Sequence, residues 1–341
     1  MESKAKKKGS GIALFSVLSV LFAVLFAAAC IGTQLAFASS QAVNIALQTS
    51  TFATKNTDDE AVYFESDFDS VEELEAHDKE IAEQLTGEGA VLLKNDGALP
   101  LAAGSKVSTL SHSSVDIVTC GTGSADIDTS KAPTLKEALE EVGLEVNPVL
   151  WDFYTTGAGK DYVRSPGKGV SLGDRAAWHI NEVPVSAYGT NVSASDVAAG
   201  LEGITDVRSS FAQYGDAAIV TISRVAGEGS DLEYGDYTDG TNVLALTQEE
   251  QDMLKMANEE FDKVIVLINS TNALECDFLN DPAYGVDAAL WIGYTGTWGL
   301  NAVADILVGN VNPSGKLVDT YCYDNTTVPG LVGYYAQAYS N

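Results

Sequence analysis

The chain has 341 residues, of which 45% are hydrophobic and 20% charged, which is typical of a globular protein with one large or two ordinary domains. Its formal net charge is −29, although the first nine residues are basic. A surface this acidic argues against a nucleic-acid partner, because phosphates are recognised by clustered Lys and Arg side chains. It is compatible with a neutral substrate such as a sugar.

The N-terminal region has the pattern of an export segment. Four lysines lie within the first nine residues, and no charged residue occurs from Gly11 to Ala38. That apolar run is long enough to span a bilayer, and the lysines would keep its N-terminal end in the cytoplasm. Ala36-Phe37-Ala38 also resembles a signal-peptidase site, so residues 1–38 are either a membrane anchor or a signal peptide. We favour the anchor, because the run exceeds the usual signal core of about 7–15 residues.

The cysteines and histidines do not form a recognisable metal or disulfide pattern. Cys30 lies in the apolar run, and the other three cysteines are far apart in the sequence. We interpret them as buried small hydrophobic residues. The sequence has no HExxH motif, paired CxxC motifs, P-loop or GxSxG elbow, so we expect neither a metal nor a cofactor.

After a polar linker at residues 39–61, strand-like and helix-like segments alternate up to about residue 325. An apolar run after Gly89 that ends in Asn95-Asp-Gly97 predicts a strand and a turn. Residues 157–192, rich in Gly, Ser, Tyr and Pro, are interpreted as an insertion or long surface loop. The remaining expected strands begin near Lys106, Glu145, Ala217, Lys263, Ala288 and Lys316, and the expected helices are Ser70 to about Leu85, Thr134–Glu141, Ala194–Gly200, Thr247–Phe261 and Trp298–Val308. This order predicts a mostly parallel, six-stranded α/β sandwich domain over residues 62–325, with helices on both faces of the sheet.

One stretch of this domain carries a candidate catalytic residue. Ala217 to Ile222 is an apolar run typical of a strand buried on both faces, and it leads to Glu228 between two glycines. Thr247-Gln-Glu-Glu250 is a capping box that opens the next helix. Functional groups gather beyond the carboxyl ends of the strands in open α/β sheets. From the pattern alone, however, an ordinary solvated carboxylate is the simpler interpretation of Glu228.

Several motifs together resemble glycoside hydrolase family 3, the β-glucosidase-like enzymes. They are Glu88-Gly-Ala-Val-Leu-Leu-Lys-Asn95 with Ala98-Leu-Pro-Leu101, Thr134-Leu-Lys-Glu-Ala-Leu139 with Val146-Asn-Pro148, Gly227-Glu-Gly-Ser-Asp231, Val264-Ile-Val-Leu-Ile-Asn269, and Ala304-Asp-Ile-Leu-Val-Gly-Asn-Val-Asn-Pro-Ser-Gly-Lys-Leu317. The last is the most specific. The resemblance is to the α/β sandwich domain that accompanies the catalytic barrel in this family, and it covers roughly Val62 to Asp324.

The resemblance implies retaining glycoside hydrolysis, with an Asp nucleophile on the barrel and the Glu of the GEGxD motif as acid/base. Carried over, Glu228 is the acid/base and Asp231 a substrate-side residue. Leu232 stands where the family often has Arg, so any contact made by that Arg is in doubt. Trp298 is either a platform for the apolar face of a sugar or a helix-start aromatic packed on the sheet.

The domain order resembles the inverted subgroup of the family, in which the barrel follows the sandwich domain. We therefore expect residues 326–341 to begin a further region, and this chain to be a fragment or truncated product of a longer enzyme. Such a chain would act on β-linked glucosides or related sugars together with a barrel domain and would be inactive alone. A membrane-tethered, non-catalytic carbohydrate-binding or structural remnant is the alternative. In either case the main domain is expected outside the cell, attached to the membrane or secreted.

Overall fold

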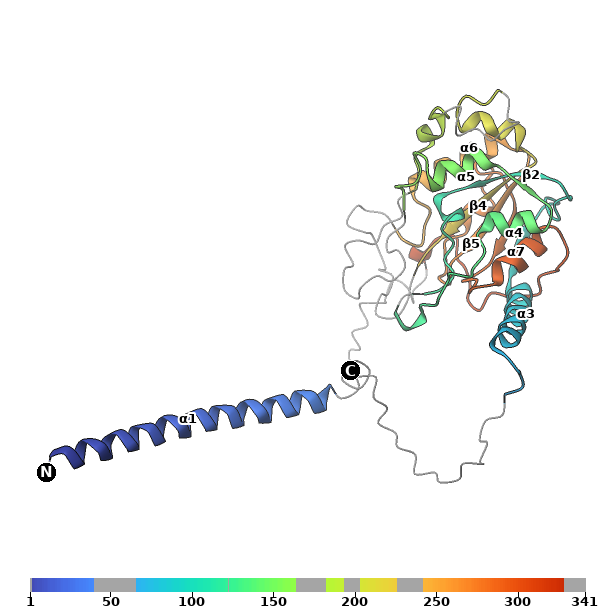
Figure 1. The fold of residues 1–341 in the computed structure, drawn as a ribbon. Helices are drawn as coiled ribbons and strands as arrows, with labels where there is room; N and C mark the ends of the chain where they lie inside the picture. Colours follow the sequence, from blue (N-terminus) through green and yellow to red (C-terminus); the bar gives the residue numbers. More distant parts are fainter. Residues whose placement is uncertain are drawn as a thin grey trace, which may run out of the picture. The chain divides into compact units, whose positions relative to one another are not determined.

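A computed structural model describes residues 2–39, 66–121, 123–163, 182–192, 203–225 and 242–327 (Figure 1). The chain divides into two compact units, Met1–Asp67 and Phe68–Asn341. The first unit contains helix α1 (Glu2–Ala38). Its portion Gly11–Phe37 has a mean hydropathy of 2.7 and is long and apolar enough to cross a membrane, as a signal sequence also is. The predicted apolar helix is confirmed, and its role as a membrane anchor or a signal peptide stays a prediction.

The second unit is built on one six-stranded sheet in its described part, with the strand order β1-β6-β5-β4-β2-β3. The strands are β1 (Val91–Asn95), β2 (Lys106–Leu110), β3 (Glu145–Val146), β4 (Ala217–Ser223), β5 (Val264–Asn269) and β6 (Val286–Trp291). All neighbouring pairs are parallel except β1 and β6, which are antiparallel. The predicted mostly parallel sheet is therefore confirmed.

The prediction of a strand near Lys316 is wrong. The sheet position beside β6 is filled by β1, the strand predicted from the apolar run before Asn95. The segment near Lys316 instead crosses the start of β1, where Gly315 N donates to Ala90 O at 3.1 Å. Val318 is 94% exposed, so this segment lacks the burial that a sheet strand needs.

Helices cover both faces of the sheet (Figure 1). Helices α4 (Leu135–Glu141) and α7 (Gly299–Leu307) pack on one face, and α5 (Pro148–Thr155) and α6 (Gln248–Glu260) pack on the other. Alternate residues of β4 enter the two hydrophobic clusters, because successive side chains of a strand point to opposite faces. The core is thus two apolar layers separated by the sheet.

The expected helix starts agree with the structure where a side-chain cap was visible in the sequence. Thr134 and Thr247 form complete capping boxes with the residues three positions later. Ser70 caps α3 (Val71–Gly89) by accepting from Glu73 N, but the Glu73 carboxylate bonds Asp69 N instead of completing a box. Helix α3 ends four residues later than expected. Pro133 directly precedes the Thr134 cap of α4.

Helix α5 was not expected from the sequence. It begins at Pro148, directly after Asn147, whose side-chain oxygen accepts from Val149 N and Leu150 N. Asn at the cap followed by Pro at the first helical position is a recognisable helix start, so the signal was available. The helix expected over 194–200 lies outside the described residues, as do 164–181 of the expected long loop.

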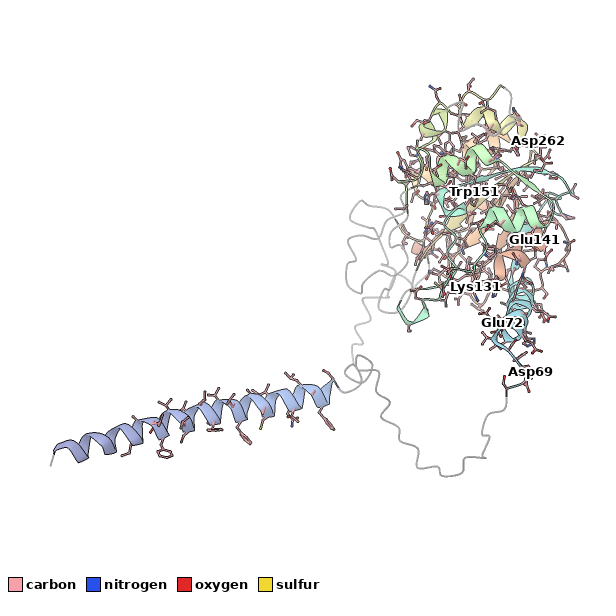
Figure 2. The ribbon with its side chains drawn as sticks, in the orientation of Figure 1. Asp69, Glu72, Lys131, Glu141, Trp151 and Asp262 are labelled. Atoms are coloured by element: carbon pink, nitrogen blue, oxygen red, sulfur yellow. The ribbon has the colours of Figure 1, made fainter. Side chains whose placement is uncertain are left out.

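Many acidic side chains lie on the outside of the sandwich, as the composition suggested. Figure 2 shows Asp69 and Glu72 at the start of α3, Glu141 at the end of α4 and Asp262 after α6, and all four are exposed. Charge at these positions favours solubility and does not disturb the core.

Candidate functional site at the carboxyl edge of the sheet

The central strands end together at one edge of the sheet. Ser223, the last residue of β4, pairs with Asn269, the last residue of β5. Beyond Ser223 the chain continues through Arg224 and Val225 toward the predicted acid/base. Glu228 and Asp231 lie outside the described residues, so their roles stay predictions. The described residues show instead how the ends of their segment are held.

Arg224 joins the two ends of the segment that contains Glu228. Its Nε donates to Val243 O at 2.5 Å, and its Nη2 donates to Ala245 O at 2.7 Å, so the residue before the segment binds the residues after it. Nη1 also donates to Ser223 O at 2.9 Å. Arg224 is 1% exposed, and all of its five N–H donors find acceptors when the Glu250 carboxylate is included.

Glu250 is the anionic partner in this arrangement. Its two carboxylate oxygens accept from Arg224 Nη1 and Nη2 at 2.8 and 2.9 Å, a bidentate pair with side chains 1% and 3% exposed. The same carboxylate accepts from Thr247 N at 2.9 Å and so completes the capping box of α6. Because the charges are paired and hydrogen-bonded, their burial is tolerated, and removing one partner would leave the other charge buried and unpaired. We call the contacts of Arg224 with Val243, Ala245 and Glu250 the Arg224 clasp.

Asn269 connects three chain segments at the same edge. Its Oδ1 accepts from Ser223 Oγ at 2.8 Å and from Val118 N at 2.7 Å, while its Nδ2 donates to Val118 O and to Gly293 O at 2.9 and 2.7 Å. The side chain is fully buried. The ends of β4 and β5 and the loops after β2 and β6 therefore share one hydrogen-bonded centre.

A second set of buried, hydrogen-bonded polar residues lies where β2 ends. Ser111 has a φ of 81°, a left-handed conformation that costs a non-glycine residue about 1–3 kcal/mol. Three hydrogen bonds hold it there: Ser111 Oγ donates to Glu182 Oε2 at 2.5 Å, Ser111 N donates to Tyr154 Oη at 2.9 Å, and Ser113 N donates to Ser111 Oγ at 3.0 Å. The surrounding contacts therefore compensate for the strain.

Glu182 is fully enclosed by this group. Burial raises the pKa of its carboxyl to about 7, while hydrogen bonds from Ser111, Val183 and His112 oppose the rise. The nearby Glu250 carboxylate raises this pKa further. Glu182 thus titrates in the neutral range, and it fixes the chain where it returns to the sheet after residues 164–181.

Trp298 lies at the N-cap of α7 and is partly buried. Lys79 of α3 places its Nζ 5.6 Å from the centre of the indole ring, a cation–π contact between the two helices. In addition, Asn301 Nδ2 donates to Glu83 Oε1 at 2.7 Å, which joins α7 to α3 at the next turn. These contacts give Trp298 a packing role. Its use as a sugar platform stays a prediction, and a sugar on the ring face beneath Lys79 would displace that lysine.

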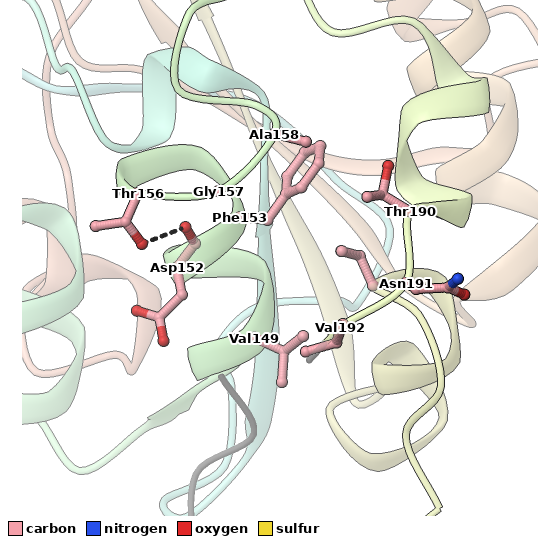
Figure 3. A pocket seen from close by; sticks show the side chains of 10 residues that line it. Val149, Asp152, Phe153, Thr156, Gly157, Ala158, Thr190, Asn191 and Val192 are labelled. Atoms are coloured by element: carbon pink, nitrogen blue, oxygen red, sulfur yellow. Dashed lines mark hydrogen bonds between the residues drawn. The ribbon is translucent and has the colours of Figure 1, made fainter. Parts of the chain in front are cut away.

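The cavities on the described surface include two small ones. One, of about 120 Å³, opens between the segment after β2 and the start of α4, and Asp116, Thr119 and Thr134 are among its polar lining residues. The other, of about 140 Å³, lies beside α5, where Val149 and Val192 face each other and the Asp152 carboxylate points away (Figure 3). The first cavity belongs to the edge that Asn269 organises, since Val118 lies between two of its lining residues.

Sequence reasoning found the position of the edge but missed the residues that build it. Arg224 carried a usable signal, because it is a cation directly after an apolar strand in a chain with only 19 Lys and Arg residues. Asn269, at the end of an apolar strand, carried a similar one. Ser111 and Glu182 offered none, since they are far apart in sequence. Within the described ranges, no cluster of His, Cys, Asp or Glu side chains is arranged to hold a metal ion.

Comparison with known families agrees with the fold. The family model described as "Glycosyl hydrolase family 3 C-terminal domain" matches residues 90–341. The chain belongs to this family. The resemblance drawn from the sequence motifs is thereby confirmed, as is the α/β sandwich of the family 3 domain.

Three relatives show how far the similarity of this family 3 domain extends. A β-glucosidase of Ruminococcus albus is 28% identical over 254 residues, which are 73% of this chain and 23% of the relative. β-Glucosidase A of Butyrivibrio fibrisolvens is 28% identical over 267 residues, 73% of this chain and 29% of the relative. β-Glucosidase 3B from Thermotoga neapolitana, solved in complex with glucose, is 27% identical with a TM-score of 0.58, covering 78% of this chain and 33% of that one. The matched part of the chain thus spans only 23–33% of the relatives' length.

Proposed function

We propose that this family 3 domain supplies the acid/base Glu228 and part of the sugar site of a retaining glycosidase that acts on β-glucosides or related sugars. Its relatives are β-glucosidases, and the Thermotoga neapolitana enzyme was solved with glucose. The Arg224 clasp is the observation that carries the proposal, because it fixes both ends of the segment containing Glu228 at the carboxyl edge of the sheet. A barrel domain, in the same polypeptide or a neighbouring chain, provides the nucleophilic Asp.

The chemistry requires two carboxyl groups about 5–5.5 Å apart. Glu228 protonates the leaving oxygen while the barrel Asp attacks the anomeric carbon, and it then takes a proton from the water that releases the sugar. An acid working near neutral pH needs a raised pKa, and burial beside a second carboxylate provides it. Asp231 contacts the substrate side of the site, and Trp298 borders it.

We further propose that α1 keeps the domain at the outer surface of the membrane. The four lysines before the apolar stretch hold its N-terminal end inside, so that residues after Ala38 face outward. A neutral sugar reaches such an acidic domain without electrostatic repulsion. If the segment is cleaved after Ala38 instead, the same domain is secreted.

The test is Glu228→Ala in the complete enzyme, with Glu233→Ala in the same segment as the matched control. Dinitrophenyl glucoside needs no proton on its leaving group, so glycosylation by this substrate should survive the change. Hydrolysis of substrates with poor leaving groups should fall by about 10²-fold or more. Azide should restore turnover of the activated substrate, because it replaces the water that needs a base.

A different result would overturn the proposal. If Glu228→Ala lowers activity equally on activated and unactivated substrates and azide has no effect, Glu228 is not the acid/base. If Glu228→Ala matches Glu233→Ala on every substrate, while the domain still binds sugar, then the domain is a membrane-tethered carbohydrate-binding unit without a catalytic role.

A further inference from the structure

Tyr294 lies on the loop that follows β6 at the carboxyl edge of the sheet. Its hydroxyl donates to Arg224 O at 3.2 Å, although the two residues are 70 positions apart in the sequence. Strand β5 lies between β6 and β4 in the sheet, so the Tyr294 side chain crosses the end of β5 to reach the end of β4. It therefore connects the loop after β6 to the point where the chain leaves β4 toward Glu228.

The hydrogen bonds of neighbouring residues hold Tyr294 in place. Gly293 O accepts from Asn269 Nδ2 at 2.7 Å, and Gly296 N donates to Thr119 O at 2.8 Å. Both glycines have a positive φ, 57° and 62°, which lets the backbone turn sharply on either side of Tyr294. The tyrosine itself is partly buried. Its loop is thus attached to the sheet edge before and after it, and its hydroxyl has a defined position.

The acceptor, Arg224 O, belongs to the peptide unit that joins Arg224 to Val225. A peptide unit is planar, so a hydrogen bond to its oxygen orients the whole unit. The other parts of Arg224 have contacts of their own, since its N donates to Asn269 O at 3.2 Å and its side chain forms the Arg224 clasp. The hydrogen bond from Tyr294 acts on the next link of the chain and sets the direction in which the chain leaves the sheet.

The direction at this point matters for a carboxyl group further along. Glu228 follows Arg224 by four residues, which span at most about 14 Å, so a turn of about 10° at the start moves the far end by up to about 2 Å. A misplacement of about 1 Å at a reacting group can cost about 10²-fold in rate. An acid/base carried by this segment is therefore sensitive to the orientation of the peptide unit after Arg224.

We propose that Tyr294 is a positioning residue for the acid/base Glu228. The inference rests on the proposed function and adds a residue to the same site. Tyr294 does not act on the substrate, because its hydroxyl is directed at the backbone of Arg224. It orients the chain so that the Glu228 carboxyl reaches the leaving oxygen. Protonation of that oxygen depends on this reach, whereas departure of a good leaving group does not.

The test is Tyr294→Phe in the complete enzyme, with Tyr284→Phe as the matched control. Phe keeps the ring and removes only the hydroxyl. Tyr284 precedes β6 at the opposite edge of the sheet, is also partly buried, and donates its hydroxyl to Gln251 Oε1 at 3.3 Å. Each variant loses one such hydrogen bond, so both should lower the Tm by a similar amount of about 2–4 °C.

The measurement that separates positioning from stability is kcat/KM with two aryl glucosides. Phenyl glucoside needs a proton on its leaving oxygen, and dinitrophenyl glucoside does not. Tyr294→Phe should lower kcat/KM about 10-fold for the phenyl substrate and less than about 2-fold for the dinitrophenyl substrate. Tyr284→Phe should change neither value by more than about 2-fold.

Glu228→Ala, measured on the same two substrates, distinguishes the two ways in which the inference can fail. If Tyr294→Phe affects both substrates equally, or no more than Tyr284→Phe does, the hydrogen bond serves stability alone and the inference is overturned. The proposed function would then still stand, provided that the loss in Glu228→Ala is confined to the phenyl substrate. If Glu228→Ala shows no dependence on the leaving group, the proposed function fails, and the inference fails with it.

Discussion

Replacing Arg224 by Met should destabilise the domain far more than removal of an exposed arginine. The Glu250 carboxylate, 3% exposed, would lose both N–H donors of the guanidinium and keep the bond from Thr247 N. The carbonyls of Val243 and Ala245 would also lose their donors. Removing one partner of a buried ion pair costs about 3–5 kcal/mol. We therefore expect a loss of this size in the free energy of unfolding.

Arg208 provides the matched control. It forms an ion pair with Glu260, but these side chains are 39% and 31% exposed. Exposed pairs contribute about 0.2–1 kcal/mol, so Arg208→Met should cost less than about 1 kcal/mol. The assay is urea unfolding of the full chain in mild detergent, followed by tryptophan fluorescence, with the slope compared among variants to check that the transition is unchanged.

A double-mutant cycle separates the ion pair from general packing. Glu250→Gln keeps an oxygen for Thr247 N but removes the charge, so Arg224→Met should cost less in that background. We expect a coupling energy of about 2 kcal/mol or more for Arg224 and Glu250, against less than about 1 kcal/mol for Arg208 and Glu260. If Arg224→Met costs less than about 1 kcal/mol, or if the two coupling energies are equal, the clasp does not hold the domain as we describe.

Other predictions concern the edge and the activity. The pKa of Glu182 is about 7 in the folded state and 4.5 ordinarily, so the protonated carboxyl stabilises the fold fully below pH 4.5, and this stabilisation declines by about 3 kcal/mol as the pH rises to 7. The difference in unfolding free energy between wild type and Glu182→Gln should decline with pH in the same way, and a difference that is constant with pH would contradict the prediction. Ser111→Gly relieves the strained φ whereas Ser111→Ala keeps it, so Ala should be the less stable variant in thermal unfolding although both lose the hydroxyl; equal Tm values would show that the strain is negligible. Trp298→Ala should lower the Tm through lost contacts with Lys79, and a loss of sugar affinity at unchanged Tm would instead favour the platform role. The purified chain alone should release no nitrophenol from an aryl glucoside above background, because its acid/base would lack a nucleophile; robust release would refute that assignment.

The fold was predictable where the chain carries local signals. Thr247 showed where α6 starts, since a capping box is readable within four residues. The apolar runs of β4 and β5 predicted strands buried on both faces. The strand expected near Lys316 was wrong because the local sequence does not show whether a sheet position is already occupied. Helix α5 was missed although Asn147 and the following proline indicate a helix start.

The edge was less predictable, because its contacts are not local. Glu250 was recognised as a cap, but its pairing with Arg224 depends on where α6 docks against the end of β4. Asn269 joins segments more than a hundred residues apart in the sequence, and no spacing within its own strand reveals Val118 as its partner. Side-chain contacts of this kind follow from the packed fold, so local sequence patterns predict where the strands end but not which side chains meet there.

The Arg224 clasp also bears on how the specificity of such a domain can change. Residues between Val225 and Asn242 connect two points that Arg224 already holds together, so insertions or deletions among them leave the register of β4 and the start of α6 unaltered. The entropy of closing a chain segment grows slowly with its length, by about 0.6 kcal/mol for each doubling. Under the function proposed above, exchange of this stretch would change which sugars are accepted, while the sheet beneath it stays the same.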